Sequence, residues 1–115
     1  MIEKQDFEDL EQQLDTLASQ KKLNSSEAKP LLDHYFELII DYFKQINEIS
    51  DFDLTLLDNY PVVPMNFSER YQYMQARKYH FMGYRQMKTL KSELIKMNAL
   101  TRLFSFNAIF NNKVS

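Results

Sequence analysis

The first twenty residues carry apolar side chains at helical intervals. Phe7, Leu10, Leu14 and Leu17 follow one another at spacings of three, four and three, and most positions between them are acidic or amide residues. This period is that of an amphipathic helix with one buried face. The pattern therefore predicts a helix over residues 3–21.

The next segment is apolar on more than one face. Its start is marked by N-cap candidates in residues 23–26 and by Pro30, which costs little near a helix start because first-turn amides have no intrahelical acceptor. We expect this helix to run to about Glu48. Its apolar residues are too many for one stripe, which predicts that it is covered on several sides and forms the centre of the core. They are Leu31, Leu32, Tyr35, Phe36, Leu38, Ile39, Ile40, Tyr42, Phe43, Ile46 and Ile49.

Residues 50–65 form the least regular stretch and are predicted to be the main connection. Residues 51–57 have the composition of a short helical turn, and two prolines follow them. A residue that precedes proline avoids the helical region, so Tyr60 and Val63 are expected to be extended.

A third helix is predicted to begin at Asn66. Asn66 and Glu69 have the spacing of a capping box, in which each side chain satisfies a backbone amide of the other residue. The apolar period is then interrupted at Lys78 and resumes at repeated spacings of three, which a continuous helix cannot keep on one face. A break is therefore predicted near residues 77–83, where Gly83 permits a kink or a close contact.

Beyond Met87 the helical pattern recovers and predicts a helix to about Leu103. The segment that follows, residues 104–110, holds three phenylalanines and an isoleucine. This composition predicts that the tail is either packed or a contact site.

Few residues of the chain favour tight turns. One glycine and three prolines among 115 residues disfavour strands throughout. The elements together predict an all-α fold, a small antiparallel bundle of about four helices, in a single domain over residues 1–115. Because the chain shows no secretory-signal pattern and no run of about 18 apolar residues, we expect a cytoplasmic protein that does not enter a membrane.

The charge of the chain is divided unevenly along the sequence. Residues 1–66 hold five basic and 14 acidic side chains, a net charge of −9, whereas residues 67–115 hold nine basic and two acidic ones, a net charge of +7. Five basic residues stand close to aromatic ones and are the candidate anion or partner contacts. They are Arg70, Arg77, Lys78, Arg85 and Lys88.

Two interpretations of these basic residues differ in their consequences. They can bind nucleic acid by phosphate neutralisation and by base stacking on the neighbouring aromatic rings. Alternatively, the acidic N-terminal helices pack beside the basic C-terminal ones, and opposite charges face each other. The second interpretation is favoured because a net charge of −2 weakens an encounter with a duplex.

The sequence offers little for catalysis or for metal binding. The absence of cysteine excludes disulfides and thiol nucleophiles, and a single glycine excludes the glycine-rich phosphate loops. No Glu-x-x-His pair is present for a di-iron bundle, although the reverse order occurs once, at His34 and Glu37. We expect no metal and no cofactor. An enzyme that uses His34 or His80 is a third and less favoured hypothesis.

Two short motifs resemble those of a protein family. Residues 61–77 contain Pro-x-Asn-x-x-Glu-Arg followed by a tyrosine and then an arginine, and resemble the signature region of the YpoC-like proteins of Gram-positive bacteria. Gln86, Leu90, Glu93, Lys96 and Ala99 are similar to a helix motif of that family, so that the likeness covers about residues 60–100. The resemblance implies a bacterial cytoplasmic helical protein of an uncharacterised family and supplies no catalytic residue.

Within the first of these motifs, Arg70 and Arg77 lie seven residues apart on one helical face. Two arginines so placed can hold a buried carboxylate, for which Asp41, Asp53 and Glu93 are candidates, or can present an anion site.

The leading functional hypothesis is a non-enzymatic protein–protein interaction module with an unknown protein partner or a second copy of itself. The alternative is a nucleic-acid-associated protein that uses the basic C-terminal helices.

Overall fold

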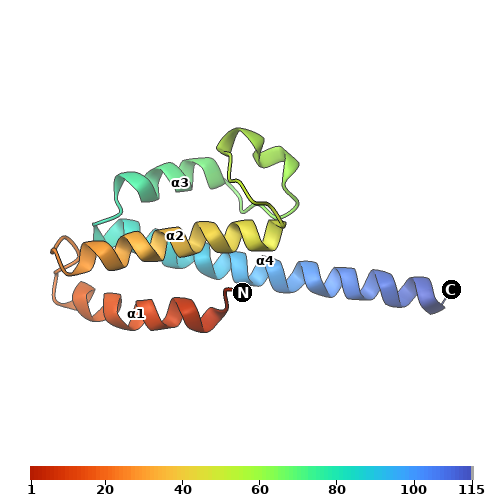
Figure 1. Ribbon diagram of the computed structural model, residues 1–115, viewed down its shortest axis with the longest axis horizontal. Helices are drawn as coiled ribbons and strands as arrows, with labels where there is room; N and C mark the ends of the chain where they lie inside the picture. The colour runs from red at the N-terminus through yellow and green to blue at the C-terminus, as the bar shows by residue number, and fades with distance from the viewer. Residues whose placement is uncertain (115) are drawn as a thin grey trace.

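Four α-helices and one short 3-10 helix make up the described part of the protein. The computed structural model describes the backbone of residues 1–114 and the side chains of residues 1–103. In chain order the elements are α1 (Lys4–Ser19), α2 (Ala28–Asn47), the 3-10 helix η1 (Leu54–Asn59), α3 (Phe67–Ala76) and α4 (Phe81–Val114). Neighbouring helices α1 and α2 run antiparallel, as do α3 and α4 (Figure 1). The predicted all-α antiparallel bundle is confirmed.

The helix α2 forms the centre of the bundle, as its many apolar residues predicted. It packs against both α1 and α4. Two of its rings also contact α3: Phe36 lies against Tyr71 with ring centroids 5.5 Å apart, and Phe43 stacks on Phe67 at 4.7 Å. The core therefore surrounds α2 on three sides.

The helix α1 follows its predicted apolar stripe. The residues at the helical spacing, Phe7, Leu10, Leu14 and Leu17, are all buried. The helix begins where the Asp6 carboxylate accepts a hydrogen bond of 2.8 Å from the backbone N–H of Glu3. It ends at Ser19, two residues before the predicted end, and Lys21 then takes a left-handed conformation with a φ of 58°.

A buried asparagine holds the long connection against α2. The Asn47 side-chain amide donates to the carbonyl of Val62 at 2.9 Å, and its oxygen accepts from the N–H of the same residue at 2.8 Å. The Phe52 and Tyr60 rings pack edge-on against Phe43. Tyr60 is extended, with φ −96° and ψ 137°, as expected for a residue before proline.

The capping box predicted at Asn66 and Glu69 is wrong, although the helix does begin at the next residue, Phe67. Asn66 lies in the left-handed region, with φ 56° and ψ 36°, and its side chain makes no cap hydrogen bond. A side-chain cap requires an extended N-cap residue, and the preceding connection delivers the chain to α3 in a different conformation.

The break predicted near residues 77–83 is confirmed. The helix α3 ends at Ala76 and α4 begins at Phe81. Gly83 is buried in the first turn of α4, and a Cβ atom built on it would lie 1.8 Å from the carbonyl oxygen of Arg77. Glycine is therefore required here for the close approach of two backbone segments rather than for an unusual φ.

The helix α4 is longer than predicted. We expected it to end at about Leu103, but its backbone continues to Val114 and extends past the other helices (Figure 1). The chain has neither glycine nor proline after Gly83, so no residue of those types ends the helix earlier. The side chains of the phenylalanine-rich tail, residues 104–110, lie outside the part that the structure describes.

A buried polar cluster joins α1, α2 and α4. The Lys91 ammonium lies 2.8 Å from the Glu11 carboxylate, and these side chains are only 10% and 12% exposed. The Tyr35 hydroxyl donates a hydrogen bond to the same carboxylate oxygen. Burial raises the pKa of Tyr35 far above its ordinary value, and the hydrogen bond to Glu11 raises it further.

The close approach at Gly83 predicts that an alanine there destabilises the protein instead of stabilising it. Replacing a glycine by alanine inside a helix ordinarily stabilises it by about 1 kcal/mol. Because a methyl group would collide with the Arg77 carbonyl, we expect Gly83→Ala instead to lower the free energy of unfolding by about 1–3 kcal/mol. Urea unfolding measures this, with Thr89→Ala at an exposed position of α4 as the control. A stabilised Gly83→Ala variant would contradict the contact.

The buried pair generates a second prediction. Lys91→Met leaves the Glu11 carboxylate buried without its cation, and we expect a loss of about 3 kcal/mol in the free energy of unfolding. The matched control is Lys4→Met, which removes the exposed 3.7 Å pair with Glu8 and should change stability by less than about 0.5 kcal/mol. Equal effects of the two substitutions in denaturant titrations would show that the buried pair has no special role.

Candidate functional site

The five candidate basic residues do not form one patch. Arg70 lies on α3, Arg77 and Lys78 lie in the connection that follows it, and Arg85 and Lys88 lie on α4. Three of them are in ion pairs with carboxylates, and each pair reaches a different helix. The expectation that opposite charges face each other across the bundle therefore describes most of this set.

Arg70 joins α3 to α4. Its guanidinium lies 2.6 Å from the Glu93 carboxylate, and its Nε donates to the side-chain oxygen of Gln86 at 3.1 Å. A third hydrogen bond, of 3.3 Å, goes to the Met65 carbonyl. Glu93 was one of the three carboxylates expected to meet the two arginines of this face, and Arg70 alone holds it.

Lys78 joins the α3–α4 connection to α2. Its ammonium lies 3.2 Å from the Asp33 carboxylate and 4.9 Å from the ring centre of Phe36. The Tyr79 hydroxyl donates to the same carboxylate oxygen at 2.7 Å. The Tyr79 hydrogen bond, followed by that of Lys78, lowers the pKa of Asp33 despite the opposing effect of burial. Lys78, which interrupts the apolar period, thus sits over an aromatic ring with its charge paired.

Lys88 joins α4 to α1. Its ammonium and the Tyr84 hydroxyl both donate to Asp15, at 2.9 and 2.7 Å. Burial alone would raise the pKa of Asp15, but these hydrogen bonds and the positive charge of Lys88 lower it below its ordinary value. The resulting stabilisation is present above the ordinary pKa of an aspartate and is lost as the pH falls through the lowered value.

Arg77 and Arg85 are exposed and form no ion pair within residues 1–103. The Arg77 guanidinium lies over the ring of Tyr73, with its carbon 5.6 Å from the ring centre, and does not reach the carboxylate that Arg70 holds. These two arginines are therefore the members of the predicted set that are available to a ligand.

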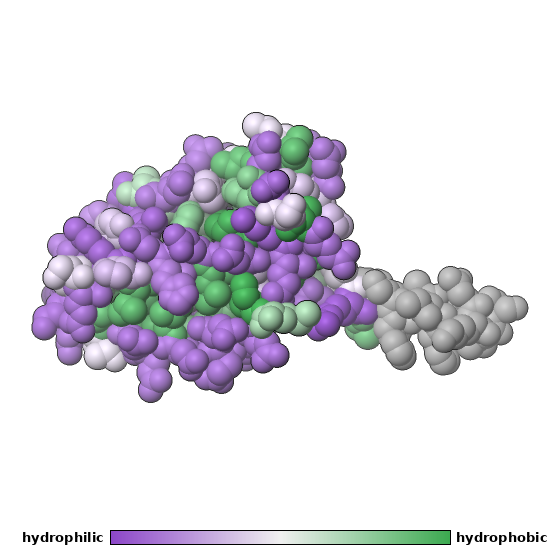
Figure 2. All heavy atoms as spheres, in the orientation of Figure 1, coloured by the Kyte–Doolittle hydropathy of each residue, from purple (hydrophilic) through white to green (hydrophobic). Residues whose placement is uncertain are grey.

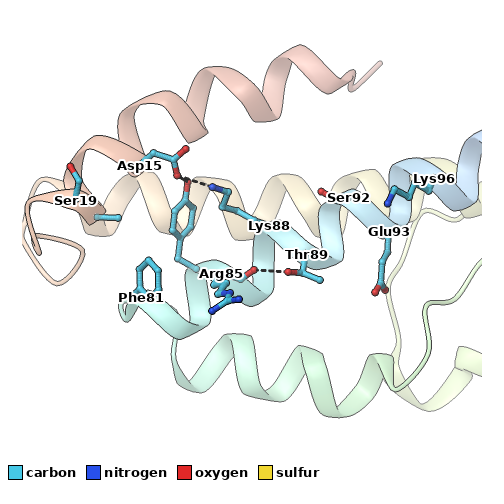
Figure 3. Close-up of a pocket in the computed structure, with 11 residues that line it drawn as sticks. Asp15, Ser19, Phe81, Arg85, Lys88, Thr89, Ser92, Glu93 and Lys96 are labelled. Carbon is cyan, nitrogen blue, oxygen red and sulfur yellow. Dashed lines mark hydrogen bonds and ion pairs between the residues drawn. The ribbon is translucent and has the colours of Figure 1, made fainter.

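An open groove runs along the face of α4 that lies between α1 and α3 (Figure 3). Its volume is about 750 Å³. Arg85 and Lys88 lie on this face together with the exposed Phe81 ring, and Asp15 marks the edge formed by α1. The complete lining is Asp15, Ala18, Ser19, Phe81, Tyr84, Arg85, Lys88, Thr89, Ser92, Glu93 and Lys96.

A smaller groove of about 570 Å³ lies between α1 and α2, where Figure 2 shows apolar surface between polar margins. His34 is exposed here beside Asp6 and Asp9, and its ring forms no hydrogen bond to another described side chain. His80 is exposed at the start of α4. The enzyme hypothesis stays a prediction, and among the described side chains no hydrogen bond fixes the orientation of either imidazole.

Sequence patterns gave Glu93 as one of three candidate partners of Arg70 but did not identify the partners of Lys78 and Lys88. Lys91 stands four residues after Met87 and three before Leu94, so its position has the phase of the buried residues of α4. This phase was the signal that its charge is buried. Glu11 has the same phase in α1, four residues after Phe7 and three before Leu14. No such signal marks Asp15, which looks like an ordinary acidic residue of a solvated helix face.

In the described part of the chain, no helix is long and apolar enough to cross a membrane. The same residues contain no cluster of three or more side chains of the kinds that bind metal ions.

The chain matches the family described as YpoC-like protein over residues 3–105. No curated protein and no solved structure matches it. The match extends well beyond the two motifs that carried the resemblance, and Arg70 of the first motif contacts both Gln86 and Glu93 of the second. The motifs thus encode the junction between α3 and α4. The chain belongs to the YpoC-like protein family.

Proposed function

We propose that this chain is a non-enzymatic interaction module that binds a protein chain through the C-terminal half of α4. The observation that carries the proposal is the exposure of apolar side chains on this part of the helix. Among the side chains of α4 that the structure describes, Leu94 is the last fully buried one, and Leu100 and Leu103 are 54% and 55% exposed. From there the helix continues to Val114, away from the other helices (Figure 1).

The energetics support a partner for this segment. A helix of this length that packs on nothing is marginal in water, because helices in proteins owe most of their stability to a buried face. Covering one leucine contributes about 1.5–3 kcal/mol. The sequence continues with Phe104, Phe106 and Phe110, and aromatic residues are enriched at the centres of protein interfaces.

The nucleic-acid alternative has weaker support from the same contacts. Arg70, Lys78 and Lys88 are in ion pairs within the bundle, so a phosphate would have to compete with a carboxylate at each of them. Only Arg77 and Arg85 of the candidate set are then available to bind a phosphate. The net charge of −2 also disfavours an encounter with nucleic acid. A protein–protein contact requires no such exchange of partners.

Site-specific photo-crosslinking tests the proposed contact. A photoreactive phenylalanine analogue at Leu103 should give a discrete protein adduct in cells that naturally express the chain. The same analogue at the exposed Gln75 of α3 should not. Leu100→Glu should remove the adduct and leave the unfolding midpoint unchanged, because Leu100 is exposed. Equal labelling from positions 103 and 75, or none from either, would contradict the proposal.

Binding to labelled single-stranded DNA tests the alternative. We expect no measurable change in fluorescence anisotropy at about 50 mM salt, a condition in which phosphate contacts are strong. Binding that weakens as salt rises, and that Arg77→Ala with Arg85→Ala abolishes, would favour the nucleic-acid function instead.

A further inference from the structure

The groove on α4 and the projecting end of α4 lie along one row of the helix. Within the groove this row is formed by residues at spacings of four, three, four and four, which keep to one face of an α-helix. They are Phe81, Arg85, Lys88, Ser92 and Lys96. At helical spacing the sequence continues the row with Ala99, Leu103, Phe106 and Phe110. The row thus changes from basic and polar to apolar where the helix leaves the bundle.

This arrangement prevents the two halves of the row from meeting within one chain. A single straight helix cannot fold its projecting end back onto its own face. Two helices that pack antiparallel place the projecting end of each against the groove of the other. We propose that the protein that α4 binds is a second copy of this chain, paired in this way about a two-fold axis near Met97. The inference rests on the proposed function and names its partner.

The lengths of the two halves agree. The groove row extends from Phe81 to Lys96, which at about 1.5 Å per residue is about 22 Å of helix. A two-fold axis at Met97 places residues 98–113 of one copy opposite residues 96–81 of the other. The described helix reaches Val114, so the projecting half is long enough to cover the whole groove row.

The groove also has a surface suited to such a segment. Ala18 and the half-exposed ring of Phe81 provide apolar contact, and Phe81 is 56% exposed in the single chain. The long stems of Arg85 and Lys96 can lie along apolar side chains while their charges stay in water. A volume of about 750 Å³ leaves room for several large side chains.

Charge on its own does not select this partner. Residues 94–115 contain basic residues at positions 96, 102 and 113 and no acidic residue. The helix α1, which forms one edge of the groove, carries five carboxylates and one lysine, but of these only Asp15 lines the groove, and Lys88 already holds it. The groove row is itself basic at Arg85, Lys88 and Lys96, so the projecting end meets it through apolar side chains rather than through opposite charge. The pairing is self-complementary, so it closes at two copies and leaves no unpaired groove.

Light scattering coupled to gel filtration tests the stoichiometry. The monomer mass is 13.8 kDa, and we expect about twice this value for the full chain at micromolar concentration. Leu103→Glu on the projecting row and Ala18→Glu in the groove should each weaken the dimer at least about tenfold, because each places a charge in the buried contact. Tyr73→Glu, at an exposed aromatic position of α3, should leave the dimer intact.

Disulfide trapping tests the orientation, since the chain contains no cysteine of its own. Positions 92 and 103 lie at nearly equal distances along the helix before and after Met97. An antiparallel pair therefore brings Ser92→Cys of one copy close to Leu103→Cys of the other. An oxidised mixture of the two variants should form a covalent dimer, and each variant alone should not. Covalent dimers from each variant alone would indicate parallel pairing and overturn the inference.

The outcomes separate this inference from the proposed function. A monomeric mass at all concentrations, together with an adduct from position 103 to a different protein, overturns the self-pairing and leaves the interaction module standing. A monomeric mass without any adduct overturns both.

Discussion

The buried pair of Glu11 and Lys91 is the constraint on which the arrangement of the helices depends. Each charge is stable inside the protein only because the other stands within hydrogen-bond distance, and the Tyr35 hydroxyl occupies the same carboxylate oxygen. Because these three residues come from three helices, the cluster fixes α1, α2 and α4 in one register. Apolar packing alone would permit helices to slide by a turn at small cost, whereas such a slide would leave this pair broken.

The same logic accounts for the uneven distribution of charge along the sequence. Outside the buried pair, Lys88 meets Asp15 of α1 and Lys78 meets Asp33 of α2. The acidic N-terminal helices and the basic C-terminal ones are thus two sides of one internal interface. A strongly basic segment in a sequence is for this reason weak support for an external anion, because an acidic segment of the same chain is present at far higher effective concentration.

The parts of the fold that depend on local sequence could be predicted, and those that depend on distant contacts could not. The period of Phe7 and Leu14 and the interruption at Lys78 are local signals, and they located α1 and the break before α4. Asn66 shows the limit of such signals, because its side chain suits a helix cap while its backbone conformation is set by the preceding connection. For Arg70 the sequence left three candidate carboxylates and did not choose Glu93, 23 residues away, among them. The partner of Lys88 lies 73 residues away in the chain, and no spacing within one helix encodes it.

These features together explain why the unpartnered surface is on α4. This helix uses one face for the core and its margins for the pairs with α1 and α3, and it therefore has a remaining face that none of the described elements covers. Inside the bundle that face can be polar, because neighbouring helices already stabilise the backbone. Beyond the bundle the helix has no such support, and only the apolar row that begins at Leu103 can provide a buried face. We therefore propose that a second surface completes this helix, and the groove along its own first half has the length to be that surface.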